Sequence, residues 1–179
     1  SLSFARIKER DYEKTKQKMC EVLRNIYIKF CYIKDSEKLT DADRAYYERM
    51  LEENIKETDA TSSLYQLSDF LYRYYGKKVI ILLDEYDTPM QEAFVDGYWD
   101  ELVAFTRSLF NSTFKTNPAL ERGIMTGITR VSKESVFSDL NNLKIVTTTS
   151  NEYASVFGFT EKEVFDALEQ YGLEKEKKR

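Results

Sequence analysis

The stretch that decides the fold is VIILLDE, residues Val79–Glu85. Its first five residues are aliphatic, and the β-branched side chains among them favour a strand over a helix. Because no polar residue alternates within the run, we expect a strand that is buried on both faces, as in a parallel sheet. The run ends in Asp84 and Glu85, so two carboxylates would lie at the carboxyl edge of that sheet.

Helical and extended patterns alternate on both sides of this strand, which indicates an α/β domain. Apolar residues recur every three or four positions in the segments that we expect to be helices: 9–32, 41–57, 61–75, a short one after 87–89, 98–114 and 160–172. Further strands are expected at 1–4, 123–129 and 143–149, and a short helix is expected to begin near Ser132. The predicted architecture is a small parallel sheet flanked by many helices.

Polar residues mark several of the predicted helix starts. Thr40 is expected to cap one helix, and Asp87 another, just before Pro89. Thr160 and Glu163 have the spacing of a capping box.

Composition excludes several classes of protein. The 179 residues contain no histidine, which removes Ser-His-Asp and Cys-His triads and histidine metal ligands. The net charge of −4 does not favour nucleic-acid binding by this chain. Cys20 and Cys31 are too few for a zinc cluster and, unpaired, suit a reducing compartment, so we expect a cytoplasmic protein. No apolar run is long enough to span a membrane.

Four apolar residues followed by Asp-Glu form the Walker B pattern of ATPases that use a glutamate base. In that interpretation Asp84 would hold Mg²⁺ through its water shell, and Glu85 would orient and polarise the water that attacks the γ-phosphate. The alternative is a buried strand that leaves the core through two solvated acids.

The second strand ends in hydroxyl residues. In such ATPases the neighbouring strand ends in a polar residue, called sensor 1, that contacts the γ-phosphate or the water. Thr129 fits that position best and Thr126 is the second candidate. Alternatively, both are threonines that simply favour strands. Arg130 follows and could contact phosphate or form a surface salt bridge.

Three ordered blocks resemble the predicted AAA-ATPase-like proteins of bacteria, which often carry a C-terminal nuclease-like domain. The blocks are Leu82–Pro89, Gly127–Leu143 and Phe157–Val164. The resemblance implies a P-loop NTPase fold of the additional-strand, catalytic-glutamate branch with strand order 5-1-4-3-2. Residues 1–4 would then be strand 2, residues 79–83 strand 3 and residues 123–128 strand 4.

The phosphate loop of that family, G-x-x-x-x-G-K-[ST], is absent from the 179 residues. The only Gly-Lys pair, Gly76-Lys77, follows a helical pattern and is expected to end that helix. We therefore expect residues 1–179 to be a truncated ATPase domain, cut just after the loop. Its parts would be a helical insertion at about 9–76, a Walker B and sensor core at about 77–149 and a C-terminal helix at about 160–172.

The sequence thus predicts the ATP-binding and ATP-hydrolysing domain of an AAA-like P-loop ATPase that needs Mg²⁺, with this chain alone inactive. The runner-up is a degenerate, non-catalytic interaction or regulatory module. A nuclease is disfavoured, because the only E-x-K near a helix end is Glu176–Lys178 in the tail. Nucleic acid would be a partner only through another domain of the parent. Without strand 1, the edge of strand 123–128 would be exposed and could recruit a second copy, unless residues 143–149 cover it.

Overall fold

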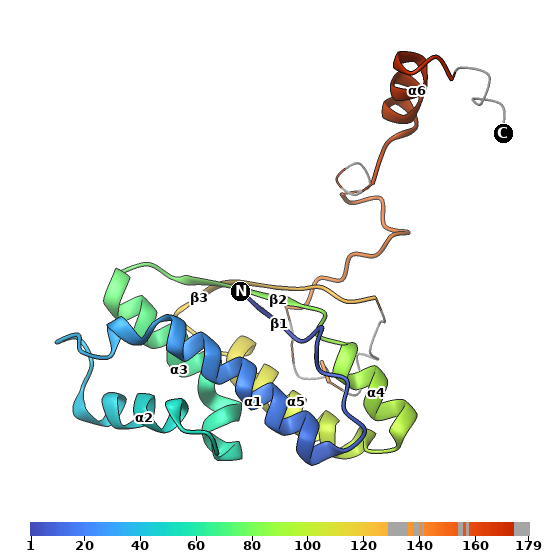
Figure 1. Ribbon diagram of the computed structural model, residues 1–179. Coiled ribbons are helices and arrows are strands. Elements are labelled where there is room, and N and C mark those ends of the chain that lie inside the picture. Colours follow the sequence, from blue (N-terminus) through green and yellow to red (C-terminus); the bar gives the residue numbers. More distant parts are fainter. Residues whose placement is uncertain (129–135, 138–139, 141, 154–155, 157, 174–179) are drawn as a thin grey trace. The chain divides into compact units, whose positions relative to one another are not determined.

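The computed structural model describes residues 1–128, 136–137, 140, 142–153, 156 and 158–173. The chain divides into two compact units, Ser1–Asn141 and Asn142–Arg179. The first unit contains a parallel sheet in the order β1 (Leu2–Ser3), β2 (Val79–Asp84) and β3 (Leu120–Met125) (Figure 1). This order confirms the predicted arrangement of these three strands.

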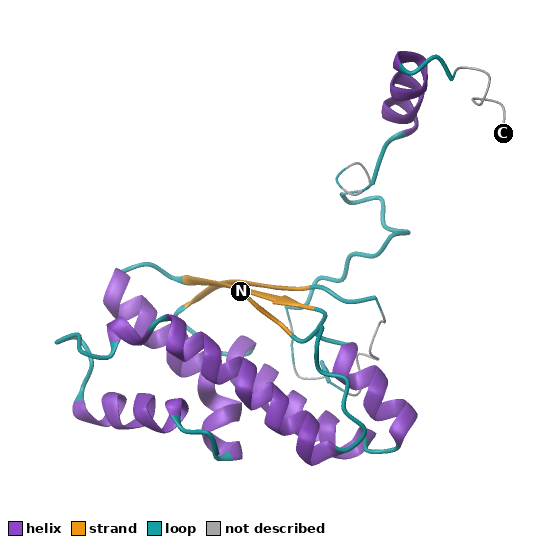
Figure 2. Ribbon diagram, viewed as in Figure 1, coloured by secondary structure: helices purple, strands orange, loops and turns teal. Residues whose placement is uncertain are grey.

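Most of the described residues are helical, as Figure 2 shows in purple. The helices of the first unit are α1 (Tyr12–Lys29), α2 (Asp41–Leu51), α3 (Glu57–Tyr75), α4 (Thr88–Asp96) and α5 (Trp99–Phe114), with a 3₁₀ turn at Cys31–Ile33. The second unit contains α6 (Glu161–Gln170). Among the described helices, none combines the length and apolar character that crossing a bilayer needs.

Capping explains several helix boundaries. The predicted cap at Thr40 and the predicted capping box of Thr160 and Glu163 are both confirmed. Asp11 caps α1 by accepting a 2.9 Å hydrogen bond from the Lys14 backbone nitrogen. Gly76 ends α3 in the left-handed conformation, with φ of +67°, as a helix stop requires.

The sheet is covered on one face, which corrects the prediction that β2 is buried on both. In the first unit α1, α3 and α5 lie on one side of the sheet (Figure 1). Ile81 and Leu83 point into this helical layer and are buried, whereas Ile80 is 56% exposed and Leu82 44% exposed. Ile124, the partner of Leu82 in β3, is exposed as well. The aliphatic run therefore has an open face that no described helix of this unit covers.

Buried aromatic residues join the helices below the sheet. Tyr27 and Tyr47 are fully buried, and their rings meet edge-on at 4.8 Å. Burial of a phenol requires a partner for its hydroxyl. The Tyr27 hydroxyl donates to the Ser63 carbonyl at 2.7 Å, and the Tyr47 hydroxyl donates to the Tyr27 carbonyl at 2.8 Å. The core can therefore hold polar hydroxyls, because each has an acceptor.

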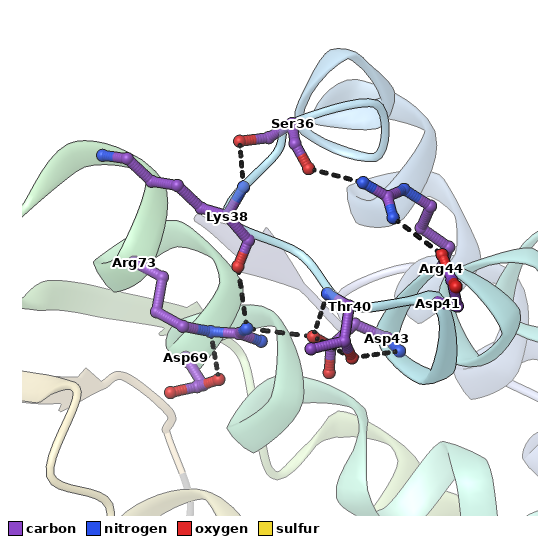
Figure 3. Close-up of polar contacts among 8 residues, drawn as sticks. All are labelled: Ser36, Lys38, Thr40, Asp41, Asp43, Arg44, Asp69 and Arg73. Atoms are coloured by element: carbon purple, nitrogen blue, oxygen red, sulfur yellow. Dashed lines mark hydrogen bonds and ion pairs between the residues drawn. The ribbon is translucent and has the colours of Figure 1, made fainter.

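Arg73 of α3 fastens the loop that leads into α2 (Figure 3). Its guanidinium donates to the Lys38 carbonyl at 3.0 Å and to the Asp43 carboxylate at 2.9 Å, and it forms a 2.9 Å ion pair with Asp69. Asp43 also accepts a 2.8 Å hydrogen bond from the Thr40 backbone nitrogen. One carboxylate thus serves both the helix cap and the bridge between helices.

We expect Asp43→Asn to lower the free energy of unfolding at pH 7 by about 1–2 kcal/mol, because the cap and the Arg73 contact both weaken. Partial burial pushes the pKa of Asp43 upward, but hydrogen bonds from Arg73 and Thr40 outweigh it and hold the pKa below its usual value. The native ion therefore stabilises the fold above the ordinary pKa of about 3.9, and this contribution disappears as pH falls through the lower folded pKa. Urea unfolding should show a smaller difference in the free energy of unfolding between the native chain and Asp43→Asn at low pH than at pH 7. Asp41→Asn, two residues earlier and solvent-exposed, is the control.

Two predicted strands differ from the structure. β3 begins at Leu120 rather than at Gly123, because Leu120 pairs with Val79. The strand predicted at residues 143–149 is wrong, because these residues form no strand. The helix expected near Ser132 lies outside the described residues. Among the residues that the structure describes, β3 pairs with β2 alone and is an edge strand, as predicted.

Candidate functional site

Asp84 and Thr126 meet at the carboxyl edge of the sheet, although they stand 42 positions apart. The Thr126 backbone continues the ladder beyond β3, since its nitrogen donates to the Leu83 carbonyl at 2.9 Å and its carbonyl accepts from the Tyr86 nitrogen at 3.1 Å. This pairing points the Thr126 hydroxyl at Asp84, and the hydroxyl donates a hydrogen bond to Oδ1. Both residues are solvent-exposed, so the edge is open to a ligand.

Glu85 follows in a conformation that non-glycine residues rarely adopt. Its φ is +49°, in the left-handed region. The reversal turns the chain out of β2 and into α4, which starts three residues later. The Glu85 carboxylate accepts a 3.0 Å hydrogen bond from the hydroxyl of Thr88, the first residue of α4. Strained backbone of this kind is typical of functional sites. The sequence did not single out Thr88, which stands three positions after Glu85 and begins α4.

Asp87 corrects a prediction. It stands at the N-cap position of α4, yet its side chain makes no capping hydrogen bond. Instead the residue is fully buried, and Oδ2 accepts a 3.0 Å hydrogen bond from Gln91. Pro89 lies in the first turn, as predicted. Asp87 therefore supports the turn from within and does not belong to the exposed edge.

Gly127 lets the chain after β3 pass close to this turn. A Cβ at Gly127 would lie 2.7 Å from Asp87 Cγ and 3.0 Å from Tyr86 Cε1. Both distances are shorter than ordinary van der Waals contact, so only glycine fits without a shift of the turn. Gly127 is thus a packing requirement for the turn that contains Tyr86 and Asp87.

We expect Gly127→Ala to lower the free energy of unfolding by about 1–3 kcal/mol, the usual cost of forcing an extra methyl into a packed site. Ile128→Ala at the next position is the control, because Ile128 is 91% exposed. Urea unfolding of both variants gives the comparison. Equal stability of Gly127→Ala and the native chain would contradict the close packing described above.

The remaining predicted site residues, Thr129 and Arg130, lie outside the described residues. Thr126, the second candidate from the sequence, is the residue that contacts Asp84. The part of the chain that the structure describes contains no group of three or more His, Cys, Asp or Glu residues placed to hold a metal. Asp84 and Glu85 each offer a carboxylate at the open edge beside a hydroxyl, that of Thr126 for Asp84 and that of Thr88 for Glu85.

Two cavities lie away from this edge. One, of about 70 Å³, is partly open and is lined mainly by apolar residues, including Ile26, Leu67 and Ile81. The other is an open cleft of about 480 Å³ at the amino end of β2. Neither contains Asp84, Glu85 or Thr126 in its lining. The candidate site is thus an exposed sheet edge.

Comparison with known proteins gives one family and one partial relative. The model of a family described as Predicted AAA-ATPase matches residues 1–137. A protein of Azotobacter chroococcum mcd 1, described as "Uncharacterized protein in vnfD 5'region", is 31% identical over 90 residues. That stretch is 50% of this chain and 17% of the relative, so the match covers a small part of that protein. No solved structure matches the chain.

Proposed function

The chain belongs to the Predicted AAA-ATPase family, and from this premise we propose that the edge formed by Asp84, Glu85 and Thr126 takes part in Mg²⁺-dependent ATP hydrolysis. The observation that carries the proposal is the contact between the Asp84 carboxylate and the Thr126 hydroxyl at the carboxyl ends of parallel strands. Ligands of open α/β sheets bind at that edge. The Walker B pattern of the sequence ends at the same edge, in Asp84 and Glu85.

The donor set at this edge suits Mg²⁺. Mg²⁺ prefers hard oxygen ligands and usually keeps several waters, binding one or two carboxylates and the phosphates of its nucleotide. One exposed carboxylate, Asp84, with the neighbouring Thr126 hydroxyl, fits such a site better than it fits an ion that needs many protein ligands. When bound, Mg²⁺ would neutralise charge on the phosphates. Asp84 would hold its water shell.

Glu85 has the position of a general base. It follows Asp84 directly, and its backbone nitrogen lies 3.4 Å from the Thr126 hydroxyl, so the three residues converge. Glu85 would accept a proton from the water that attacks the γ-phosphate. Thr126 would orient Asp84 through its hydrogen bond. We retain Thr129 as a candidate for contact with the γ-phosphate or the water, and Arg130 as a candidate for contact with phosphate.

The phosphate loop would come from outside these 179 residues, because no G-x-x-x-x-G-K sequence occurs in them. Two features support a position beside β3 for the segment that carries the phosphate loop. The outer edge of β3 pairs with no strand among the described residues, and Ile80, Leu82 and Ile124 form an apolar stripe on the open face. We propose that a strand joins β3, that its loop ends beside Asp84 and that the helix after the loop covers this stripe. A second copy at the β3 edge is the alternative occupant.

The test is Asp84→Asn in the full-length protein with its phosphate loop. We expect Mg²⁺ to strengthen ATP binding in the native protein and to strengthen it about tenfold less in the variant, because the amide lacks the charge that holds the hydrated ion. Isothermal titration with ATP, with and without Mg²⁺, measures the difference. Asp100→Asn, an exposed acid of α5, is the control. An unchanged Mg²⁺ effect in Asp84→Asn would remove Asp84 from the site.

A further inference from the structure

An exposed apolar corner surrounded by acidic residues lies at the junction of α4 and α5. Phe94 is 75% exposed and Val95 is 79% exposed, and the Phe94 ring meets Trp99 edge-on at 6.0 Å. Residues 88–106, which span α4 and the first half of α5, carry the four acidic residues Glu92, Asp96, Asp100 and Glu101 and no lysine or arginine. We call the residues Phe94, Val95, Asp96, Trp99 and Asp100 the acidic corner.

The acidic corner is locally unfavourable, which points to a role outside the folding of α4. Asp96 is the last residue of α4, whose final turn contains no basic residue, so its charge faces the negative end of the helix. Two large apolar side chains beside it are left in water. Among the described residues, neither Asp96 nor Asp100 takes part in an ion pair. A partner that is apolar and cationic would satisfy all three features.

A surface of that chemistry lies at the other end of the same unit. The open cleft of about 480 Å³ is lined by Phe30, Leu71, Tyr75, Lys77, Lys78 and Val79. We call this the lysine cleft. Its floor is apolar, Tyr75 is 52% exposed, and both lysines are exposed and form no ion pair in the part of the chain described. The lysine cleft lies where α3 leads into β2, and the acidic corner lies where α4 leads into α5; Figure 1 shows the end of α3 and α4 at opposite ends of the sheet.

We propose that the acidic corner of one copy of this chain docks in the lysine cleft of a second copy, head to tail. The Phe94 and Val95 side chains would enter the apolar cleft, and Asp96 and Asp100 would face Lys77 and Lys78. A two-fold contact of either surface with itself would bring like charges together, so charge complementarity selects the heterologous arrangement. The proposal is independent of ATP hydrolysis and of the β3 edge.

The test uses two charge-reversed variants of the 179-residue chain, Asp96→Lys/Asp100→Lys and Lys77→Glu/Lys78→Glu. Sedimentation velocity over a range of protein concentrations, at about 50 mM NaCl where screening is weak, should show association of the native chain. Each variant alone should associate at least about 100-fold more weakly, because like charges now face each other. An equimolar mixture of the two variants should associate again, because each reversed surface meets its complement.

The control Glu52→Lys/Glu53→Lys reverses two exposed acids after α2 and should associate like the native chain. Circular dichroism checks that every variant is folded. A native chain that stays monomeric would overturn the proposal, and so would association that neither variant weakens, which would indicate another interface such as the β3 edge. A mixture that fails to associate would overturn the head-to-tail arrangement.

Discussion

Glu85→Gln is expected to abolish most ATP hydrolysis while leaving Mg-ATP binding close to native. The amide keeps the shape of the side chain and can still accept the 3.0 Å hydrogen bond from Thr88, but it cannot take a proton from water. Removal of a general base typically lowers the rate by about 10²–10⁴-fold. Phosphate release by the full-length protein, together with a nucleotide-binding titration, measures the two effects separately.

Glu101→Gln is the matched control, because Glu101 is an exposed glutamate in the first turn of α5. It should leave both hydrolysis and binding unchanged. If Glu85→Gln keeps its turnover, Glu85 is not the base. If the native full-length protein binds ATP without hydrolysing it, the chain is a non-catalytic member of its family, and the acids at the end of β2 serve binding or structure.

The largest effect on stability is expected for Phe70→Ala, which should lower the free energy of unfolding by about 3–5 kcal/mol. Phe70 is fully buried at the centre of the helical layer, with the rings of Tyr46 at 6.3 Å and Tyr47 at 6.0 Å. The Arg73 guanidinium also lies 5.4 Å from the centre of its ring. Truncation leaves a cavity and removes all three contacts. The expected loss is a large part of the free energy of unfolding of a typical domain, about 5–15 kcal/mol.

Urea unfolding followed by circular dichroism measures this loss. Tyr72→Ala, two residues further along α3 and 40% exposed, is the control and should cost much less. Similar losses for both variants would mean that the helical layer does not depend on the packing around Phe70.

The local patterns that the sequence predicted correctly are those set by nearby residues. The 3.6-residue periodicity located α1 and α5 to within about three residues, and the capping box of Thr160 and Glu163 formed as expected. The start of α3 was missed by four residues, from Thr61 to Glu57, because its N-cap, Lys56, makes no side-chain capping bond. A boundary without a capping side chain leaves little signal in the sequence.

Features that depend on distant parts of the chain were harder to predict. The start of β3 was not predicted, because Glu121 and Arg122 are two consecutive charged residues. In this exposed edge strand, apolar and polar side chains do not alternate along the chain as they do in a half-buried strand. The aliphatic run of β2 indicated burial on both faces of the strand, but helices cover only one face. Periodicity reports how apolar a strand is, not which layer covers it.

The candidate site shows the same limit. The positions of Asp84 and Glu85 followed from where the aliphatic run ends, so the sequence predicted them directly. The contact of Asp84 with Thr126 depends on the register between β2 and β3, which no local pattern specifies. The buried position of Asp87 depends on Gly127, 40 positions later, and the sequence showed only its place before a proline.

The two-residue strand β1 has a consequence for the order in which the molecule folds. Leu2 pairs with Leu83, and the Phe4 backbone nitrogen bonds to the Asp84 carbonyl at 3.0 Å, so this strand joins the sheet across about 80 residues of chain. Closing so long a loop costs entropy before the few hydrogen bonds of β1 can offset it. The helices between β1 and β2 consist of local contacts and form on a faster timescale. We therefore expect β1 to dock after α1 and α3 have assembled.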